Sequence, residues 1–371
     1  MTRGIQQRGF SLIEVMISTV VSLFATLAIM QSFAVSEGYR RTATSGGDAA
    51  FSGAVGAYLL DRDLQMAGYG INTGVYLGCQ VSGFDELATP VQPIGFTLAP
   101  VQITPGTGVN PDSITVVSSS TGWLPAPITL TTSMASPSDN YQVNNPFGVT
   151  AGDVAILAQS GNNACTLVQA TNTPTAGTAG SQNTVQHTSG TYRITGGATV
   201  AARYNPTGGV GPAYPANSVL IDMGAAPTVS TYSIQNNTLV VTQQVTGAGQ
   251  PVQPVAANIV QLKALYGKDT AGGGTITAWN TAAPVSATQW AAVLAIRVAL
   301  VARSAQPEKQ TDPTSGTCST TIAAPIVTWD DGGTTTLDLS GTTPTGPAWQ
   351  CYRYRVFHMT ASLRNLIWTP A

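Results

Sequence analysis

The start of the chain is dominated by one apolar run. From Phe10 to Val35 the only charged residue is Glu14. At about 1.5 Å per residue, a helix of this length crosses a hydrocarbon core of roughly 30 Å. No proline occurs before Pro90, so nothing in the sequence forces a kink in this helix or its continuation. The pattern predicts a membrane-spanning helix close to the N-terminus.

Helical spacing of apolar residues resumes beyond this run, and it predicts a stripe that packs on a globular head. The stripe consists of Phe51, Val55, Tyr58, Leu59 and Met66. Gly46-Gly47 is a weak spot, because glycine disfavours helix, and Gly68-Tyr69-Gly70 supplies a stop. We therefore expect one long helix over 10–68, half in the membrane and half on the head.

The remainder, 69–371, alternates short β-branched or apolar segments with turns rich in Gly, Pro and Asn, which is typical of strands. The strand candidates are 113–117, 153–158, 166–170, 232–241, 293–303 and 352–363. Asn236-Asn237 suits the tight turn of a hairpin, whereas segment 258–267 fits a helix or a strand. We expect Arg297 and Arg303 to face solvent. The predicted fold is α+β, a long hydrophobic helix packed on a large β-rich head.

Residues 1–9 are short and polar, with Arg3 and Arg8 as their charges. They lack the apolar core that precedes the cleavage site of an ordinary secretory signal. The arginines favour a cytoplasmic N-terminus by the positive-inside rule. A plain signal anchor with an accidental glutamate would satisfy these observations too.

The string from Gly9 to Glu14, Gly-Phe-Ser-Leu-Ile-Glu, resembles the class III signal of type IV pilins and pseudopilins. The resemblance implies that a prepilin peptidase removes residues 1–9 by cutting between Gly9 and Phe10, and that Phe10 becomes an N-methylated terminus. It also implies that Glu14, the fifth residue after the cut, pairs with the terminal amine of a neighbouring subunit. In lipid, a carboxylate and an ammonium are each costly alone and far less so together.

Segments near both ends and in the last third resemble the PilW group of minor pilins. They are 63–70, 258–267, 295–303, 352–356 and 363–365, while the region 75–254 resembles no family. The resemblance implies a minor pilin active in pilus assembly or initiation and in a tip complex, with other major and minor pilins as partners. It implies the inner membrane before assembly and the extracellular pilus afterwards. Pilin resemblance leaves twitching, adhesion and DNA uptake equally open. The alternatives are a minor pseudopilin of a type II secretion system, and a membrane-tethered adhesin or hydrolase.

Composition narrows the chemistry of the head. Charged residues make up 9% of the chain, against about 25% in ordinary soluble domains, and no basic patch exists to meet the phosphates of a nucleic acid. The four cysteines have no CxxC spacing and only two histidines exist, so a zinc site is not expected. An even cysteine count in an exported head favours two disulfides over reduced, buried thiols.

Three disulfide pairings are possible. We favour Cys318 with Cys351, which closes a C-terminal loop as pilin heads often do, and Cys79 with Cys165. Neither His187 nor His358 has a nearby Ser-Asp pattern of a nucleophile, and Asp330-Asp331-Gly332-Gly333 fits a β-turn better than a calcium loop. We therefore expect no catalytic residues, cofactor or metal.

Overall fold

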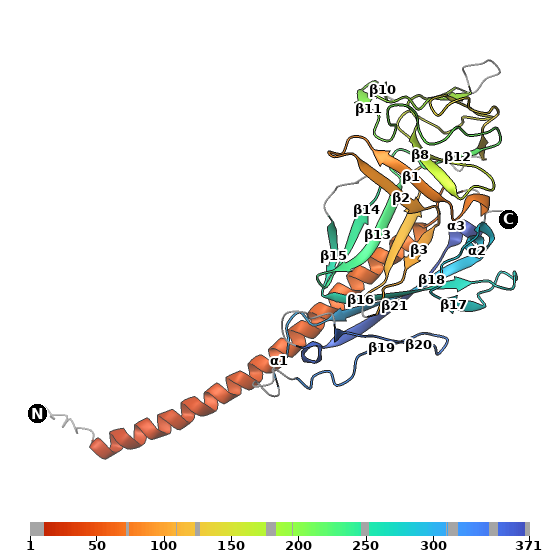
Figure 1. Cartoon of the computed structure of the whole chain (residues 1–371). Coiled ribbons are helices and arrows are strands. Elements are labelled where there is room, and N and C mark those ends of the chain that lie inside the picture. The colour runs from red at the N-terminus through yellow and green to blue at the C-terminus, as the bar shows by residue number, and fades with distance from the viewer. Residues whose placement is uncertain are drawn as a thin grey trace, which may run out of the picture.

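The structure is a computed structural model of the 371-residue chain. It describes residues 11–71, 74–108, 110–122, 127–175, 183–194, 196–245, 252–308, 310, 318–340 and 348–367. A long helix projects from a head built of β-sheets, and the N-terminal end of this helix lies far from the head (Figure 1). The architecture is the α+β arrangement that the sequence predicts.

Helix α1 spans Leu12–Met66. It runs without interruption through Gly46 and Gly47, although each glycine disfavours helix by about 1 kcal/mol relative to alanine. Contacts with the head lie on both sides of the glycines, at Thr42 and at Ala49, and support the helix there. It ends where the sequence predicts, and Gly68 takes a left-handed conformation with φ 77° just beyond the last turn.

Four antiparallel strands form the sheet nearest α1, in the order β17-β16-β18-β21. These strands are β17 (Ala278–Asn280), β16 (Ile259–Lys268), β18 (Val293–Arg303) and β21 (Tyr354–Ser362). In the register, Leu262 of β16 lies opposite Leu300 of β18. Helix α1 packs against β18 and β21 on one face, and the hairpin of β19 (Ile326–Thr328) and β20 (Thr334–Thr336) packs on the other (Figure 1).

A second antiparallel sheet, in the order β15-β14-β13-β4-β3, packs beside the first. Its strands are β15 (Gln253–Ala257), β14 (Thr238–Gln243), β13 (Thr228–Gln235), β4 (Ser113–Ser118) and β3 (Val101–Thr104). The backbone N–H of Ile103 donates to the Tyr266 hydroxyl at 2.5 Å, which ties β3 to β16. Strand β15 also contacts α1, so the helix touches both sheets.

The third sheet lies at the end of the head away from the projecting helix, in the order β2-β1-β8-β7-β12-β5 (Figure 1). Its strands are β2 (Gln92–Thr97), β1 (Gln80–Asp85), β8 (Ala164–Gln169), β7 (Val154–Ala158), β12 (Val219–Asp222) and β5 (Ile128–Thr129). Strands β1 and β8 pair in parallel, and the other neighbours are antiparallel.

Short elements complete the described part of the chain. The strand pairs are β6 (Tyr141–Gln142) with β9 (Thr184–Val185), and β10 (Thr191–Arg193) with β11 (Thr199–Ala201). The short helices are η1 (Gly74–Tyr76), α2 (Ala287–Ala291), η3 (Trp349–Cys351) and α3 (Arg364–Ile367).

One hydrophobic core joins α1 to all three large sheets. It includes Leu60 and Leu64 of the helix, Leu300 of the first sheet, Leu239 of the second and Ile156 of the third, each fully buried. Burial of each such side chain contributes about 1.5–3 kcal/mol. The second half of α1 is therefore an integral part of the head.

The strand predictions are confirmed at β4, β7, β8, β18, β21 and the β13–β14 hairpin. Asn236 and Asn237 form the hairpin turn with φ of 48° and 58°. The ambiguous segment 258–267 lies almost entirely in strand β16, whose two faces are both largely buried. A strand buried on both faces does not alternate apolar and polar residues, which is why its pattern could also be that of a helix.

The expectation that Arg297 faces solvent is wrong. This residue is 9% exposed. Its Nη1 donates to Asp331 Oδ2 at 2.8 Å, and its guanidinium lies 3.8 Å from the centre of the Trp279 ring. A buried charge needs such partners, and Asp331 comes from the turn of the β19–β20 hairpin. The ion pair therefore fastens that hairpin to β18.

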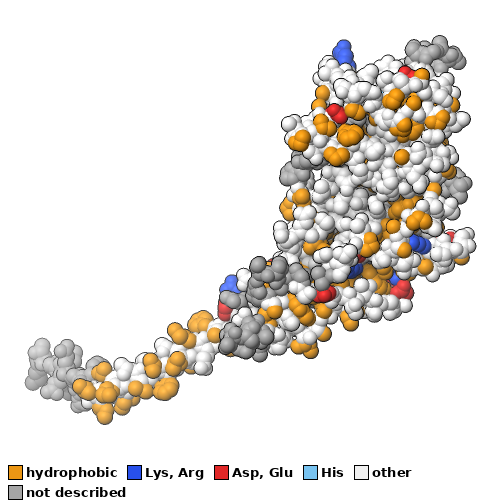
Figure 2. All heavy atoms as spheres, viewed as in Figure 1, with side chains coloured by type: hydrophobic (Ala, Val, Ile, Leu, Met, Phe, Trp, Pro, Cys, Tyr) orange, Lys and Arg blue, Asp and Glu red, His pale blue; other side chains and the backbone are white. Residues whose placement is uncertain are grey.

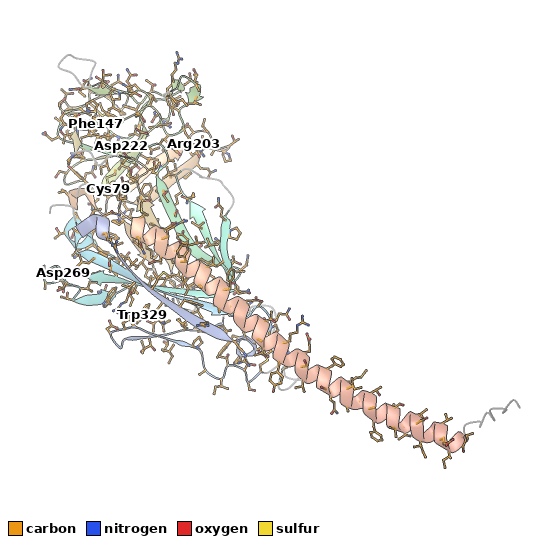
Figure 3. The ribbon with its side chains drawn as sticks, turned by 180° about the vertical axis from the view of Figure 1, so that it is seen from behind. Cys79, Phe147, Arg203, Asp222, Asp269 and Trp329 are labelled. Carbon is orange, nitrogen blue, oxygen red and sulfur yellow. A yellow bond between two sulfur atoms is a disulfide. The ribbon has the colours of Figure 1, made fainter. Side chains whose placement is uncertain are left out.

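Two disulfides join the four cysteines in the favoured pairing. Cys79 (Figure 3) is bonded to Cys165, beside the parallel pair of β1 and β8. Cys318 is bonded to Cys351 in the short helix η3, just before the last strand. The first bond joins the residue before β1 to β8 within the third sheet. The second holds the segment before the β19–β20 hairpin to η3.

Replacing both Cys318 and Cys351 with alanine should lower the free energy of unfolding by about 3 kcal/mol, because the bond restricts the unfolded chain. Urea unfolding of the full, detergent-solubilised chain measures this change. A matched variant with alanine at Cys79 and Cys165, which are further apart in sequence, should lose at least as much. An unchanged unfolding midpoint in the first variant would show that this bond adds no stability.

Candidate functional site: the N-terminal helix and its junction with the head

The first half of α1 stands free of the head. Every described residue from Ser11 to Arg40 is exposed, and apolar side chains cover this part of the helix (Figure 2). Its most apolar window has a mean hydropathy of 2.2, so by length and composition the helix can cross a membrane.

Hydroxyl side chains in this half bond to the backbone of their own helix. Ser18 Oγ donates to the Val15 carbonyl at 2.9 Å, and Ser22 Oγ donates to the Ser18 carbonyl at 2.7 Å. The hydroxyls of Thr19 and Thr26 likewise donate to the backbone carbonyl three residues before them. In hydrocarbon no water can satisfy these donors, so the internal bonds make this half compatible with lipid.

Glu14 lies in the first turn of α1 and caps it. The backbone N–H of Ser11 donates to Glu14 Oε2 at 2.9 Å, which satisfies one of the free donors at the helix N-terminus. No described cation pairs with this carboxylate. Gly9 and Phe10, the predicted cleavage site, lie outside the described residues, so the pairing of Glu14 with a terminal amine stays a prediction.

Three residues of the predicted packing stripe of α1 face away from the head, whereas Val55 and Leu59 are half-buried. Phe51 is 74% exposed, Tyr58 69% and Met66 51%. The residues that contact the head are instead small ones followed by leucines. They are Ala49, Gly53, Gly56, Leu60, Leu64 and Ala67.

Two glycines let α1 approach the sheets closely. A Cβ added at Gly53 would overlap the ring of Phe357 in β21, and one added at Gly56 would lie 3.2 Å from Ala256 Cβ in β15. A larger side chain at either position would hold the helix away from the strands. At these two positions the large side chain at the contact belongs to the sheet and the small residue to the helix. A prediction that places the large apolar residues of the helix on its buried face is therefore wrong there.

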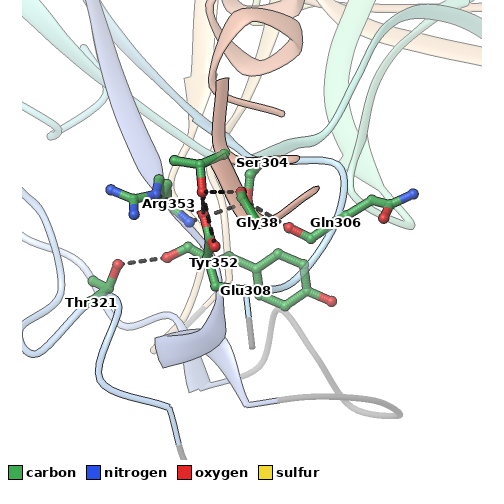
Figure 4. Close-up of polar contacts among 8 residues, drawn as sticks. Gly38, Ser304, Gln306, Glu308, Thr321, Tyr352 and Arg353 are labelled. Atoms are coloured by element: carbon green, nitrogen blue, oxygen red, sulfur yellow. Dashed lines mark hydrogen bonds and ion pairs between the residues drawn. The ribbon is translucent and has the colours of Figure 1, made fainter. Parts of the chain in front are cut away.

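A polar cluster holds α1 where it leaves the head (Figure 4). Thr42 Oγ1 donates to the Glu308 carboxylate at 3.1 Å, and Arg353 Nε donates to the same carboxylate at 2.8 Å. The backbone N–H of Glu308 donates to the Cys351 carbonyl at 2.7 Å. The junction therefore links the helix, the loop after β18 and the start of β21.

The other end of the packed half is also fixed by polar contacts. The Tyr232 hydroxyl donates to Asp63 Oδ2 at 2.5 Å, and Asn365 Nδ2 donates to the Ala67 carbonyl at 3.0 Å. The second bond satisfies a carbonyl that the end of the helix would leave free. With the junction at Thr42, these contacts fix the helix along its whole packed length.

Sequence reasoning missed the small-residue face and the junction. The spacing of Ala49, Gly53 and Gly56, four residues and then three, could have predicted the face, since small residues at helical spacing permit close packing. No sequence signal could have paired Thr42 with Glu308, because 266 residues separate them.

The histidines have structural surroundings. His187 is buried, its Nε2 bonds to the Asp139 carbonyl at 2.8 Å, and its ring stacks on Tyr141. Burial lowers the pKa of His187. His358 lies in β21, where its ring meets Trp329 edge to face. The described residues contain no group of three or more side chains suited to a metal ion.

Asp222, at the end of β12, is a buried acid (Figure 3). Its Oδ1 accepts from the Gly224 N–H at 2.9 Å, whereas its Oδ2 has no partner among the described residues. Burial, followed by the charge of Asp153, raises the pKa of Asp222 to about 7. The folded state thus binds a proton that the unfolded state releases near pH 4.

The stability of the head should therefore fall as the pH rises from about 4 to 7, by up to about 4 kcal/mol. Asparagine at position 222 keeps an oxygen for the Gly224 N–H and carries no charge, so Asp222→Asn should flatten most of this slope. Burial also raises the pKa of Asp153, and a residual slope of the same sign should remain. Urea unfolding across this pH range tests the effect, and an equally steep slope in the variant would refute it.

Comparison with known proteins places matches at both ends of the chain. Residues 5–30 match the prokaryotic N-terminal methylation motif, and residues 228–365 match the family model for type IV pilus-assembly protein W. A type IV-like pilin from Thermus thermophilus aligns over 85% of this chain and 96% of its own at 13% identity, with a TM-score of 0.31. Comparison with curated proteins gave no match.

The methylation motif, the apolar helix that carries it and the β-rich head define a type IV pilin-like protein. Within that class, the last strands of the chain, in residues 228–365, are similar to the PilW family. Pilins are structural proteins, and the motif implies processing by a prepilin peptidase. The matched residues include β13, β14, β16, β18 and β21, and so include strands that hold α1.

Proposed function

We propose that the chain is a non-catalytic minor pilin that takes part in the assembly or initiation of a type IV pilus. The observation that carries the proposal is the division of α1 into two halves. One half is exposed, and its apolar run, which reaches Val35, carries a single carboxylate, Glu14. The other half is built into the core of the head. A subunit of this form can bury its free half in lipid first and among other helices later.

The methylation motif and the apolar helix support the following order of steps. The precursor sits in the inner membrane with its N-terminus in the cytoplasm, where prepilin peptidase cuts after Gly9. Phe10 then becomes the methylated terminus. When the helix leaves the lipid for a filament of other major and minor pilins, the charge of Glu14 meets the terminal ammonium of a neighbour.

The head supports a rare position in the pilus. It spans three large sheets and several long loops, which suits the tip or an initiating complex better than a repeated filament wall. Deletion of the protein should therefore reduce the number of pili and leave secretion by a type II system intact. The reverse outcome would make it a minor pseudopilin.

N-terminal sequencing and intact-mass analysis of the membrane-extracted protein test the first step. In cells with prepilin peptidase we expect a chain that begins at methylated Phe10, and in cells without it a chain that still begins at Met1. A chain that begins at Met1 in both, or is cut beyond Val35, would remove the assembly function.

A further inference from the structure

A small open cavity lies where the third sheet meets the short helices η1 and α2. Its volume is about 170 Å³, below the ~300–1,000 Å³ of pockets that hold drug-sized ligands, so it admits one ring or side chain. Helices η1 and α2 contact each other, and Cys79 of the lining lies beside this boundary (Figure 3). Since η1 follows the C-terminal end of α1, the cavity is remote from the membrane-spanning half of the helix (Figure 1).

The described lining of this cavity contains no charged residue. Its polar residues are Gln159, Asn162 and Asn163, in the turn between β7 and β8, together with Tyr76 and Ser286. Side-chain amides and hydroxyl groups each supply both a donor and an acceptor of hydrogen bonds. The lining therefore offers no opposite charge to a phosphate, a carboxylate or an amine. It suits a neutral ligand that donates and accepts hydrogen bonds through several groups.

Two of these polar side chains are available to a ligand. Asn162 Oδ1 accepts from the Ala164 N–H at 3.0 Å, and Ser286 Oγ accepts from the backbone N–H of the third residue after it at 3.3 Å. By contrast, the side-chain amides of Gln159 and Asn163 form no hydrogen bond with any described residue. These two amides can bond to a ligand without first breaking a bond within the protein.

The backbone around the cavity is fixed on both sides. The disulfide of Cys79 joins the segment after η1 to β8. A Cβ added at Gly78 would lie 2.6 Å from Cδ1 of Trp290, so the chain there rests directly on the buried ring from α2. The Gln80 N–H donates to the Asn163 carbonyl at 2.7 Å, which holds the β7–β8 turn. A site whose groups already hold their positions loses little freedom when a ligand binds.

Apolar side chains flank the polar groups. Val75 is 65% exposed and Val285 83%, and both line the cavity together with half-buried Tyr76. A pyranose ring has hydroxyl groups around its edge and C–H groups on its faces, so it can bond to amides and pack on apolar side chains at once. Ligand sites of this kind combine apolar contact with a few polar groups that fix the orientation of the ligand.

We propose that this cavity binds one neutral saccharide residue of a larger glycan. The amides of Gln159 and Asn163 bond to its hydroxyl groups. The side chains of Val75, Val285 and Tyr76 contact its C–H groups. Because the rim is exposed, the rest of the glycan continues into solvent. This binding goes beyond pilus assembly and involves residues of the head alone, so it can be measured on the purified chain.

Saturation-transfer difference NMR tests the site on the full chain, held in a zwitterionic detergent whose headgroup contains no sugar. The probes are the methyl glycosides of glucose, galactose, mannose and N-acetylglucosamine. We expect saturation transfer to at least one of them, and weaker transfer to the methyl glycoside of glucuronic acid, since the described lining holds no cation for its carboxylate. Transfer to none of the four neutral glycosides, or equal transfer to the glucuronide, would overturn the inference.

The double variant Gln159→Ala, Asn163→Ala locates the binding. It should reduce the transfer by about tenfold, because bonds to several hydroxyl groups are lost together. The matched control is Asn110→Ala, Gln253→Ala, which removes one exposed asparagine and one exposed glutamine that do not line the cavity. It should retain the transfer of the wild type. Equal transfer in the two variants would show that the sugar binds elsewhere.

A second measurement needs no loss of a side chain. 3-Fluorotyrosine incorporated at Tyr76 should show a shifted ¹⁹F resonance when the glycoside that receives saturation is added. The same label at Tyr58, which is exposed on α1 and does not line the cavity, should show none. An unmoved resonance at Tyr76 would refute the site. All of these results are independent of pilus assembly, so failure of the proposed function would leave them unchanged.

Discussion

Replacing Glu14 with glutamine should reduce the number of pili by about tenfold or more. Glutamine keeps an oxygen that accepts the Ser11 N–H, so the first turn of α1 stays capped. The neutral amide cannot offset the ammonium of a neighbouring subunit in a medium of low dielectric constant, where a lone charge costs several kcal/mol. Counting of filaments by electron microscopy, with the amount of protein in the membrane held constant, measures the effect.

The control for this variant is Glu37→Gln, which removes a carboxylate from the same helix just beyond the apolar run. Outside hydrocarbon the charge matters little, so this variant should form pili within about twofold of the wild type. Equal piliation of the two variants, at either level, would show that the position of Glu14 within the lipid half is irrelevant to assembly.

Leucine in place of Gly53 should destabilise the packing of α1 on the head by about 3 kcal/mol. Even a Cβ at this position overlaps the ring of Phe357, and overpacking of this kind has costs of that order. The variant should unfold at a lower urea concentration. Its α1 should also become more susceptible to protease near Arg62, which is already exposed.

Gly47→Leu is the matched control, since Gly47 is exposed and nothing lies within 4 Å of its Cβ position. It should be neutral or stabilise the helix by up to about 1 kcal/mol. Adding Phe357→Ala to Gly53→Leu should restore part of the lost stability by making room for the new side chain. A Gly53→Leu protein as stable as Gly47→Leu would mean that close approach of helix and sheet is unimportant.

Much of the fold was accessible from local patterns. The limits of β18 coincide with the predicted segment 293–303, an apolar run punctuated by Arg297 and Arg303. The paired asparagines located the β13–β14 turn, because asparagine tolerates positive φ. Helix α1 and its end near Gly68 could be predicted from the apolar composition and from the helix-breaking glycines alone. These features depend on neighbours in sequence.

The predictions that were wrong concern residues whose partners are close in space but distant in the sequence. The largest apolar residues in this part of α1, such as Phe51 and Tyr58, predict the face that packs on the head, whereas contact with a sheet that carries Phe357 requires Gly53. Arg297 was assigned to solvent because its partners, Trp279 and Asp331, belong to other segments. Glu14 could be singled out because it is the only charged residue in a long apolar run. The partner that we predict for it belongs to another molecule, so the structure of one chain cannot display the pair.

The junction at Thr42 also determines how the protein bears load. Tension on the free half of α1 enters the head at Thr42 and passes through Glu308 to the start of β21. There the disulfide at Cys351 prevents the strand from being pulled away from its own loop. Further along, the helix lies against the sheet over a long contact, so separation requires many contacts to slide together rather than peel one by one. Pulling on the free half of α1 would therefore load the head through the junction and the packed half of the helix together.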